Sequence, residues 1–433
     1  MLKGIAGAFS SRNYRLFFAG QAVSLAGAWM TQTASLWLVY HLSSSAAWLG
    51  VIGFATLAPI FIFAPFAGVL VDRVNRHRLL LVTQVAAMIQ ALTLAALALT
   101  GVITVSHLLV LSLVQGVINA VDMPVRQALV VDFIERKEHL GSAIALNSAL
   151  FNMARLVGPA LGGMVIAATS AGICYLLDGF SFLAVIGALL AMRLRPRPRR
   201  ERNQHPWQDL REGFDYTRRH APIRALILLV AAVSAVGFSS SVLMPIFARD
   251  VFHGDSRTLG WLLSASGAGA LCAAIYLSTR TSVKGLGLVI RVGGVLLSAG
   301  LIGLGLARGL GVALVCMGLT GMGGVLVMAS SNTLIQTLVE DDKRGRVMSL
   351  FAMAFTGTMP FGNLLMGTMA ERLGVVITLA VAGVICGIVV VIFHLRIPRL
   401  RAAARPLLER LEQAAAEPPL FTAEEQREQL EGE

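Results

Sequence analysis

Residues 46–78 read AAWLGVIGFATLAPIFIFAPFAGVLVDRVNRHR, a long apolar run that ends in a short, strongly basic stretch. Roughly 20 apolar residues are enough for a helix to span a bilayer. The run does not alternate polar and apolar residues, as a membrane β-barrel strand would. Because lipid offers no partners to the backbone, only helices and closed barrels can cross it. The stretch therefore predicts a membrane-spanning helix followed by a basic loop.

The same pattern repeats along the chain. Of its 433 residues 56% are hydrophobic and only 14% are charged, whereas a soluble domain carries roughly 25% charged residues. The first apolar stretch is too long and too polar for a cleavable signal peptide. We expect twelve spans, at about 15–40, 46–71, 79–101, 104–132, 140–168, 171–193, 222–251, 257–279, 286–307, 310–338, 345–371 and 374–396.

The placement of the basic residues predicts the topology. A net charge of +12 could indicate a nucleic-acid partner, but most of the arginines and lysines gather in the two terminal regions, the middle linker and alternate loops. The opposite set of loops holds only Arg249, Arg257, Arg308 and Arg372. This asymmetry is typical of membrane proteins whose basic loops face the cytoplasm. We expect cytoplasmic termini, contact of the basic loops with anionic lipid, and no nucleic-acid partner.

The chain divides into two similar halves. Each half has six apolar stretches and a charged loop between the fourth and fifth, and Pro159 and Pro360 fall at similar depth in the two fifth stretches. Repeats of this kind, with the substrate site between them, are a common transporter layout. The sequence predicts an all-α membrane protein of two pseudo-symmetric six-helix bundles. Its parts are 1–192, a linker at 193–221 with a surface amphipathic helix, 222–397, and a cytoplasmic tail at 398–433.

Several chemistries lack their sequence signatures. The four cysteines lie far apart in apolar stretches, without the spacing of a metal site. The chain has no phosphate-binding glycine loop followed by lysine and no zinc-protease or serine-triad signature. We therefore expect no metal, no cofactor, no direct use of ATP and no enzymatic activity.

The fourth span carries a polar stripe. Gln115, Asn119, Asp122 and Arg126 are spaced four, three and four residues apart, which places them on one helix face. A charge at the bilayer centre costs roughly 2.5–3.5 kcal/mol on insertion scales, so this face must meet protein or water. The Asp122–Arg126 pair has two readings: a proton-sensitive or substrate-facing pair, or a fixed structural ion pair.

Two further charged residues lie inside spans. Asp178 lies within the sixth span, and Arg155, in the fifth, could offer Asp122 or Asp178 a second partner. An acid that can change its charge is what proton coupling requires. The candidates for proton coupling are therefore Asp122, Arg126, Asp178 and Arg155, with Asp122 ranked above Asp178.

Amide side chains are the candidates for lining a substrate cavity, because a polar amide inside a membrane helix needs a partner. They occur in the first, fourth, fifth and tenth spans. The set is Gln21, Gln115, Asn119, Asn147, Asn332 and Gln336.

The loop after the second span reads Gly68-Val69-Leu70-Val71-Asp72-Arg73-Val74-Asn75-Arg76. This resembles the loop signature of the major facilitator superfamily, glycine–x–leucine–x–aspartate–arginine–x–glycine–arginine. Asn75 stands where glycine is usual, and asparagine tolerates positive φ better than most residues. The resemblance implies a conformational latch formed by Gly68, Asp72, Arg73 and Arg76. Asp72 is then expected at the cytoplasmic start of the eleventh span, where a helix N-terminus stabilises a carboxylate.

The fifth span contains Gly158-Pro159-Ala160-Leu161-Gly162-Gly163. It resembles the glycine–proline–x–x–glycine–glycine motif of exchangers in the same superfamily, where the motif is linked to antiport. Small residues allow close helix approach, and proline bends a helix. The alternative is ordinary packing between membrane helices.

Within the superfamily the chain is most similar to the branch of enterobactin exporters and macrolide efflux proteins. The supporting segments are 17–21 (FFAGQ), 37–40 (WLVY), 124–129 (PVRQAL), 145–148 (ALNS) and 345–349 (GRVMS). The resemblance implies a monomeric transporter of the bacterial inner membrane. It would export a hydrophobic or amphipathic small molecule, of the drug or siderophore class, by proton antiport with alternating access. The alternatives are a lysophospholipid transporter of the same fold and a non-transporting sensor or scaffold.

The latch hypothesis gives a first prediction. Asp72→Asn should leave the protein in the membrane but slow transport, because the neutral side chain loses its interaction with the helix N-terminus. Transport assays in vesicles check this, and a flux equal to that of the wild type would refute the latch.

Overall fold

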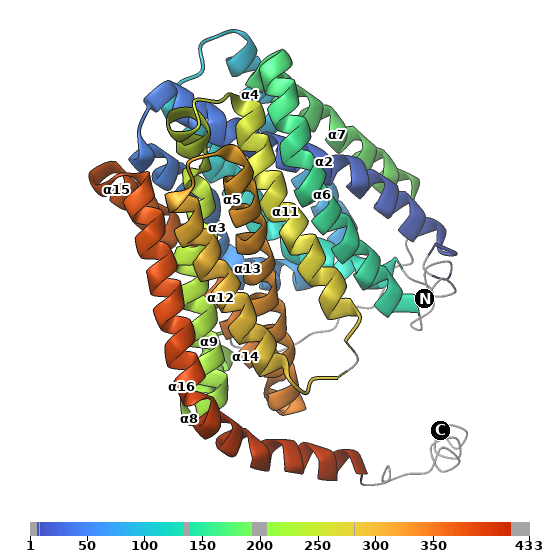
Figure 1. Cartoon of the computed structure of the whole chain (residues 1–433). Coiled ribbons are helices and arrows are strands. Elements are labelled where there is room, and N and C mark those ends of the chain that lie inside the picture. Colours follow the sequence, from blue (N-terminus) through green and yellow to red (C-terminus); the bar gives the residue numbers. More distant parts are fainter. Residues whose placement is uncertain (1–6, 8, 134–138, 193–205, 281, 417–433) are drawn as a thin grey trace.

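The computed structural model describes residues 7, 9–133, 139–192, 206–280 and 282–416, and within these ranges it is helical without strands (Figure 1). Among the described residues ten helices are long and apolar enough to cross a membrane. The first half comprises α2 (Arg12–Ser43), α3 (Ala46–Arg73), α4 (Arg76–Leu99), α5 (Val105–Asp132), α6 (Leu140–Ala168) and α7 (Ala171–Ala191).

The second half begins after the linker helix α8 (Pro206–Arg219). It comprises α9 (Ala221–Ala232), the short α10 (Met244–Ile246), α11 (Ser256–Ser278), α12 (Leu286–Leu306), α13 (Leu310–Leu338), α14 (Asp341–Thr356), α15 (Met359–Leu373) and α16 (Val375–Ala416). Two of the twelve expected spans are not among these ten helices: the first, which is α2, and the eleventh, which is formed by α14 and α15. The fold is consistent with the expected twelve spans.

The eleventh span, expected at about 345–371, consists of two helices separated by a short gap. Helix α14 ends at Thr356 and α15 begins at Met359, with Pro360 in its first turn. Proline has no N–H for the preceding turn but is favoured at a helix start. The hydroxyl of Thr358, in the gap, donates to the carbonyls of Ala231 (3.2 Å) and Ala354 (2.8 Å). Pro159, by contrast, lies inside the continuous α6.

The seventh span is irregular rather than one α-helix. After α9 the chain forms a π turn at Val233–Gly237, a 3₁₀ turn at Phe238–Leu243 and a second π turn at Phe247–Val251. Serine hydroxyls compete for backbone carbonyls in such segments: Ser239 donates to the carbonyl of Met359 at 3.2 Å and Ser240 to that of Gly237 at 2.6 Å. Single π turns inside helices are frequent at functional sites.

Apolar side chains cover the outside of the protein. On α4 the exposed stripe includes Val82, Val85 and Ile89, and on α12 it includes Leu288 and Val295. Helices α7 and α16 carry similar exposed apolar residues. A water-soluble protein does not expose apolar surface over so many helices. These faces therefore meet lipid.

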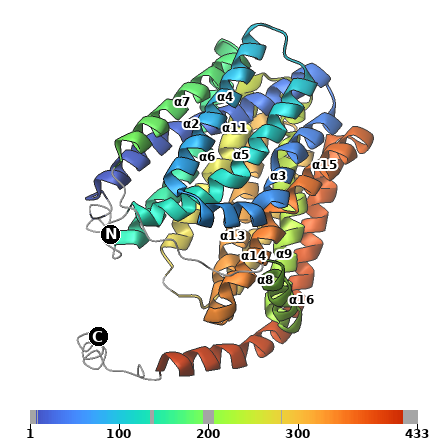
Figure 2. The same ribbon diagram turned by 180° about the vertical axis from the view of Figure 1, so that it is seen from behind.

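The two halves meet along two helix pairs, α6 with α11 and α3 with α15 (Figures 1 and 2). A Cβ on Gly163 would lie 2.5 Å from the carbonyl oxygen of Ser256, and one on Gly367 would lie 2.6 Å from that of Ala46. Glycine is needed at both points because the backbones approach so closely. Each pair joins the fifth span of one half to the second span of the other, as two related halves require.

Both close contacts lie toward one end of the molecule, which holds the α2–α3 connection at Ser44; we call it the Ser44 end. Apolar packing also continues across the halves, because one cluster of buried side chains includes Met30 and Leu49 of the first half and Leu259 and Met366 of the second. The halves are therefore joined by a shared core as well as by backbone approach.

The close approach at Gly163 gives a second prediction. Gly163→Leu should destabilise the protein by about 1–3 kcal/mol, the usual effect of overpacking, and should lower the thermal unfolding midpoint in detergent. Gly187→Leu is the matched control, because a Cβ on this helical glycine meets nothing within 4 Å. Equal midpoints for the two variants would contradict the close packing of α6 on α11.

Candidate functional site

A buried polar network surrounds Asp122 in the first half. Its carboxylate accepts hydrogen bonds from the Thr83 hydroxyl (2.8 Å) and the Gln84 amide (2.6 Å) of α4, and from the Arg126 guanidinium one turn along α5. Only 4% of Asp122 is exposed. A buried carboxylate is tolerated when several donors satisfy it, and Asp122 has three.

Arg126 links this network to a third helix and to its surroundings. Besides Asp122, its guanidinium donates to the side-chain oxygen of Gln21 on α2. The Arg126 side chain is 28% exposed, against 6% for the Asp122 side chain. Asp122 is therefore enclosed by its hydrogen-bond partners, whereas Arg126 is partly accessible from outside the network.

The sequence predicted part of this network. Asp122, Arg126 and Gln21 come together as candidates, whereas Thr83 and Gln84 were missed. The signal was present, because the two are adjacent polar residues inside an apolar stretch.

The remaining amide candidates form bonds within each half. Along α5 the Gln115 amide donates to Asn119 at 3.0 Å, and along α13 the Gln336 amide donates to Asn332. Asn147 accepts a bond from the Tyr14 hydroxyl of α2 at 3.3 Å. The fourth span of each half thus carries one pair of bonded amides, but these amides do not join the network around Asp122.

Asp178 is buried separately, between α7 and α2. It is 4% exposed, and the Ser181 hydroxyl lies 3.4 Å from its carboxylate. A Cβ on Gly27 of α2 would lie 2.6 Å from the same carboxylate, so glycine at this position makes room for the acid. Asp178 is packed inside the first half, apart from Asp122.

Arg155 pairs with neither acid, so the expectation that it offers Asp122 or Asp178 a second partner is wrong. Residues 155, 159 and 163 lie on the face of α6 that contacts α11: a Cβ on Gly260 would lie 2.6 Å from the Pro159 carbonyl, and one on Gly267 would lie 2.7 Å from the Arg155 carbonyl. The rotation of α6 thus places Arg155 at the boundary between the halves.

The neighbouring face of α6, with residues 158 and 162, packs on α2 instead. A Cβ on Gly158 would lie 2.4 Å from the Trp29 side chain, and one on Gly162 would lie 3.1 Å from the Met30 Cα. The four residues of the antiport-type motif, Gly158, Pro159, Gly162 and Gly163, therefore hold α6 between its own half and the other.

The structure describes the side chains of only some of the latch candidates. Gly68 and Asp72 lie outside the residues whose side chains are described, and Arg73 is exposed at the end of α3. Asn75 does not adopt a positive φ: with φ of −69° it is the N-cap of α4, and its side chain accepts a bond from the Arg78 N–H at 3.1 Å. Asparagine suits this position because its side-chain oxygen satisfies a free helix N–H.

Polar contacts between the halves occur at the Ser44 end, and the sequence did not predict them. Tyr40 of α2 donates to Asp250, and Glu371 of α15 accepts from the Ser45 hydroxyl and the Ala47 N–H, both at 3.1 Å. Asp250 and Glu371 had no recognisable signal beyond their position at the ends of spans.

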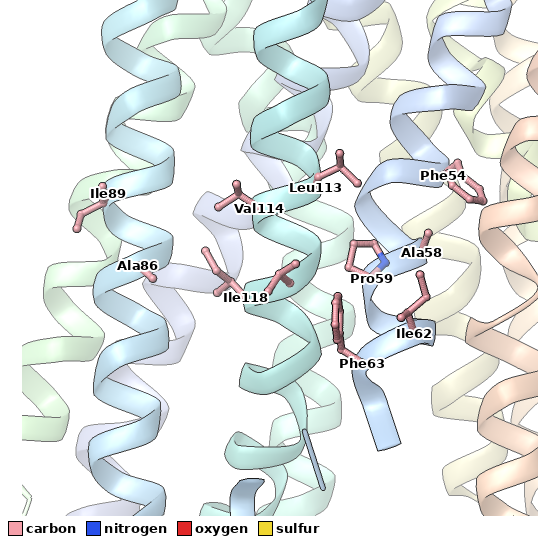
Figure 3. A pocket seen from close by; sticks show the side chains of 11 residues that line it. Phe54, Ala58, Pro59, Ile62, Phe63, Ala86, Ile89, Leu113, Val114 and Ile118 are labelled. Atoms are coloured by element: carbon pink, nitrogen blue, oxygen red, sulfur yellow. The ribbon is translucent and has the colours of Figure 1, made fainter. Parts of the chain in front are cut away.

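A large apolar cavity lies apart from these polar groups. It measures about 660 Å³ and is formed by α3, α4 and α5 (Figure 3). Its lining includes Phe54, Pro59, Ile62, Ile89 and Leu113 and contains no polar side chain. Ile62 and Ile89 are more than half exposed, so the cavity opens to the bilayer. It is suited to lipid chains and offers no group for proton coupling.

Metal ligands do not cluster in the described part of the chain, where no group of three or more histidine, cysteine, aspartate or glutamate side chains could hold an ion. The candidate site is therefore the Asp122 network, together with the boundary between the halves.

Comparison with known proteins gives a consistent result. The family described as "Transmembrane secretion effector" matches residues 5–423. The chain is 24% identical over 381 residues to the staphyloferrin A transporter of Staphylococcus aureus, covering 88% of this chain and 95% of that protein. It is 26% identical over 395 residues to the multidrug efflux pump Tap of Mycobacterium bovis, covering 88% and 92%.

The crystal structure of the nucleoside transporter NupG has the same fold, with a TM-score of 0.68 at 14% identity, over 88% of this chain and 98% of that one. The resemblance to the efflux branch of the major facilitator superfamily is confirmed by these matches.

The unequal burial of the ion pair gives a third prediction. Arg126→Met should destabilise the protein by about 3 kcal/mol, because it leaves a buried carboxylate without its cation. Asp122→Asn should cost less, because the remaining Arg126 keeps Gln21 and partial exposure. Thermal unfolding in detergent measures both, and the double variant should be more stable than Arg126→Met alone. The reverse order of the single variants would contradict the assigned burial.

Proposed function

The chain belongs to the transmembrane secretion effector family of the major facilitator superfamily, and we propose that it exports a hydrophobic or amphipathic small molecule, of the drug or siderophore class, by proton antiport. It is a multi-span membrane transporter and not an enzyme. Its relatives named above are a staphyloferrin A transporter and a multidrug efflux pump. They give no support to the alternative of lysophospholipid transport.

The contacts between the halves support alternating access. If the basic loops face the cytoplasm, the Ser44 end is periplasmic. The Tyr40–Asp250 bond and the Glu371 bonds then close the periplasmic side. Rocking of the halves about the α6–α11 and α3–α15 pairs would break these contacts and expose the site to the other side. The latch of Gly68, Asp72, Arg73 and Arg76 would hold the opposite state.

The observation that carries the proposal is the Asp122 network. Protonation of Asp122 removes its negative charge and its attraction for Arg126, because one oxygen becomes a hydrogen-bond donor. Arg126 would then be free to leave Asp122 while Gln21 still accepts from it. Since Arg126 is also the partly exposed member of the pair, a proton bound at Asp122 would change the charge that the network presents to its surroundings.

Asp178 is the second proton candidate. Its carboxylate lies against α2 at Gly27, so its charge state would act on the packing of α2 with α7.

We propose that the protein is a monomer in the bacterial inner membrane with both termini in the cytoplasm. Its partners would be the substrate, protons and membrane lipids.

Substrate identification comes first in testing this proposal. A strain that lacks the protein is screened against antibiotics and siderophores, and the compound to which it becomes sensitive is used in proteoliposomes with an imposed pH gradient. The wild type should accumulate this compound against its gradient, in the direction opposite to proton flow.

The fourth prediction concerns Asp122→Asn in the same vesicles. It should abolish accumulation driven by the pH gradient but keep exchange of labelled for unlabelled substrate, because the variant can no longer take up and release the proton. Asp215→Asn, a change of an exposed acid on α8, is the control and should behave as the wild type. Accumulation by Asp122→Asn at the wild-type level would remove Asp122 from the coupling, and flux without any pH dependence would remove antiport but keep export.

A further inference from the structure

Arg155 is a buried cation of α6 that lacks a partner among the described residues. No hydrogen bond or ion pair joins its side chain to another residue in the described part of the chain. Arginine stays charged under all ordinary conditions, and a charge near the bilayer centre is unfavourable by roughly 2.5–3.5 kcal/mol on insertion scales. Such residues are normally paired. No described residue supplies an anion for Arg155, so its charge calls for an anion from outside the described part of the chain.

Arg155 lies at the boundary between the two halves. On the same face of α6, residues 159 and 163 are in close contact with α11, toward the Ser44 end. Arg155 lies one turn further from that end. It lines a cavity of about 50 Å³ whose other lining residues all belong to the second half. The cation thus faces a site that both halves share, which is where a transporter of this layout binds its substrate.

The cavity wall adds a second free donor. Ser240, Ser241 and Thr320 line it, but their hydroxyls already donate to the backbone carbonyls of Gly237, Phe238 and Cys316, respectively. The hydroxyl of Ser266, on α11, also lines the cavity and has no hydrogen-bond partner among the described residues. Arg155 and Ser266 are therefore the two side chains with hydrogens left to donate.

The wall on the other side is the irregular seventh span. Gly237 and Phe238, at the junction of its π and 3₁₀ turns, line the same cavity. Irregular helix segments at mid-membrane are tolerated where they line a cavity. The cavity is large enough for a carboxylate or phosphate group with its water but not for a whole amphipathic molecule.

We propose that Arg155 and Ser266 bind an anionic group, a carboxylate or a phosphate, of the transported molecule. The inference rests on the proposed export function and narrows its substrate class to amphipathic anions. The charged group would enter the cavity, and the apolar part of the substrate would lie outside it, because the cavity is too small for the whole molecule. Guanidinium suits this role because its planar donors match the two oxygens of a carboxylate or phosphate.

Binding of small probes tests this without any transport step. The purified full-length protein is titrated in detergent with benzoate, with the neutral, equally sized benzamide, and with inorganic phosphate at constant ionic strength, and the thermal unfolding midpoint is followed. At least one of the two anions should raise the midpoint of the wild type, and benzamide should not.

The variants assign this effect to the site, and they give the fifth prediction. Arg155→Gln should weaken anion binding about ten-fold or more, the loss expected for a charged hydrogen bond, Arg155→Lys should keep part of it, and Ser266→Ala should weaken it less. Arg308→Gln, at an exposed arginine, should bind as the wild type. Without ligand, Arg155→Gln should unfold at or above the wild-type temperature, because it removes an unpaired charge.

Each possible result either supports or contradicts the proposed anion site. The proposal is overturned if neither anion protects the wild type, or if Arg155→Gln binds the anion as tightly as the wild type. A lower unfolding midpoint of ligand-free Arg155→Gln would show that the cation has a structural partner. Anion binding is measured without any transport step, so the two proposals can fail separately. If the protein binds the anion but does not export, only the export proposal fails. If it exports but does not bind the anion, only the proposed anion site fails.

Discussion

The constraint on which this structure depends is that the bilayer is its solvent. Lipid accepts no hydrogen bonds, so the chain is helical throughout its described membrane region and its outer faces are apolar. Every charge inside must then be matched by protein, water or ligand. Asp122 and Arg155 meet this demand in opposite ways, because Asp122 has three donors from two helices while Arg155 has no acceptor among the residues that the structure describes. The first arrangement is the proposed proton site, and the second is the proposed anion site.

Close backbone approach joins the two halves at two helix pairs. At the α6–α11 contact, a side chain at Gly163 would collide with the Ser256 carbonyl, and the α3–α15 contact has the same character at Gly367. Small residues give membrane helices such contacts in place of a hydrophobic driving force. Both contacts lie toward the Ser44 end, beside the polar contacts that close it, so the proposed rocking would have to loosen this close packing as well. The motif at 158–163 therefore packs α6 against both halves, and in the proposed mechanism this packing would also limit how the halves move.

The periodicity of the sequence predicted those features that depend on a single helix. The spans, the shared face of Asp122 and Arg126, and the small residues of the fifth span all follow from spacing. The rotation of a helix against its neighbours does not, since it depends on packing partners far away in sequence. For this reason Thr83 and Gln84 were missed as partners of Asp122, and Arg155 was assigned to the acids instead of the boundary. The break before Pro360 was missed as well, because a proline inside a span permits either a continuous helix, as at Pro159, or an interruption.

Helix α2 connects the two charged positions. Its Gln21 accepts from Arg126, and further along the same helix Trp29 and Met30 pack on the glycines of α6 at 158 and 162. Contiguity alone does not demonstrate coupling, which requires an element with two arrangements that both sites bias. In the proposed mechanism Arg126 would serve as that element, held by Asp122 while the acid is charged and released once the acid is protonated. A shift of α2 that follows its release would reach α6 directly, and with it the position of Arg155 relative to the second half. Proton binding within one half would thereby change the anion site that both halves share.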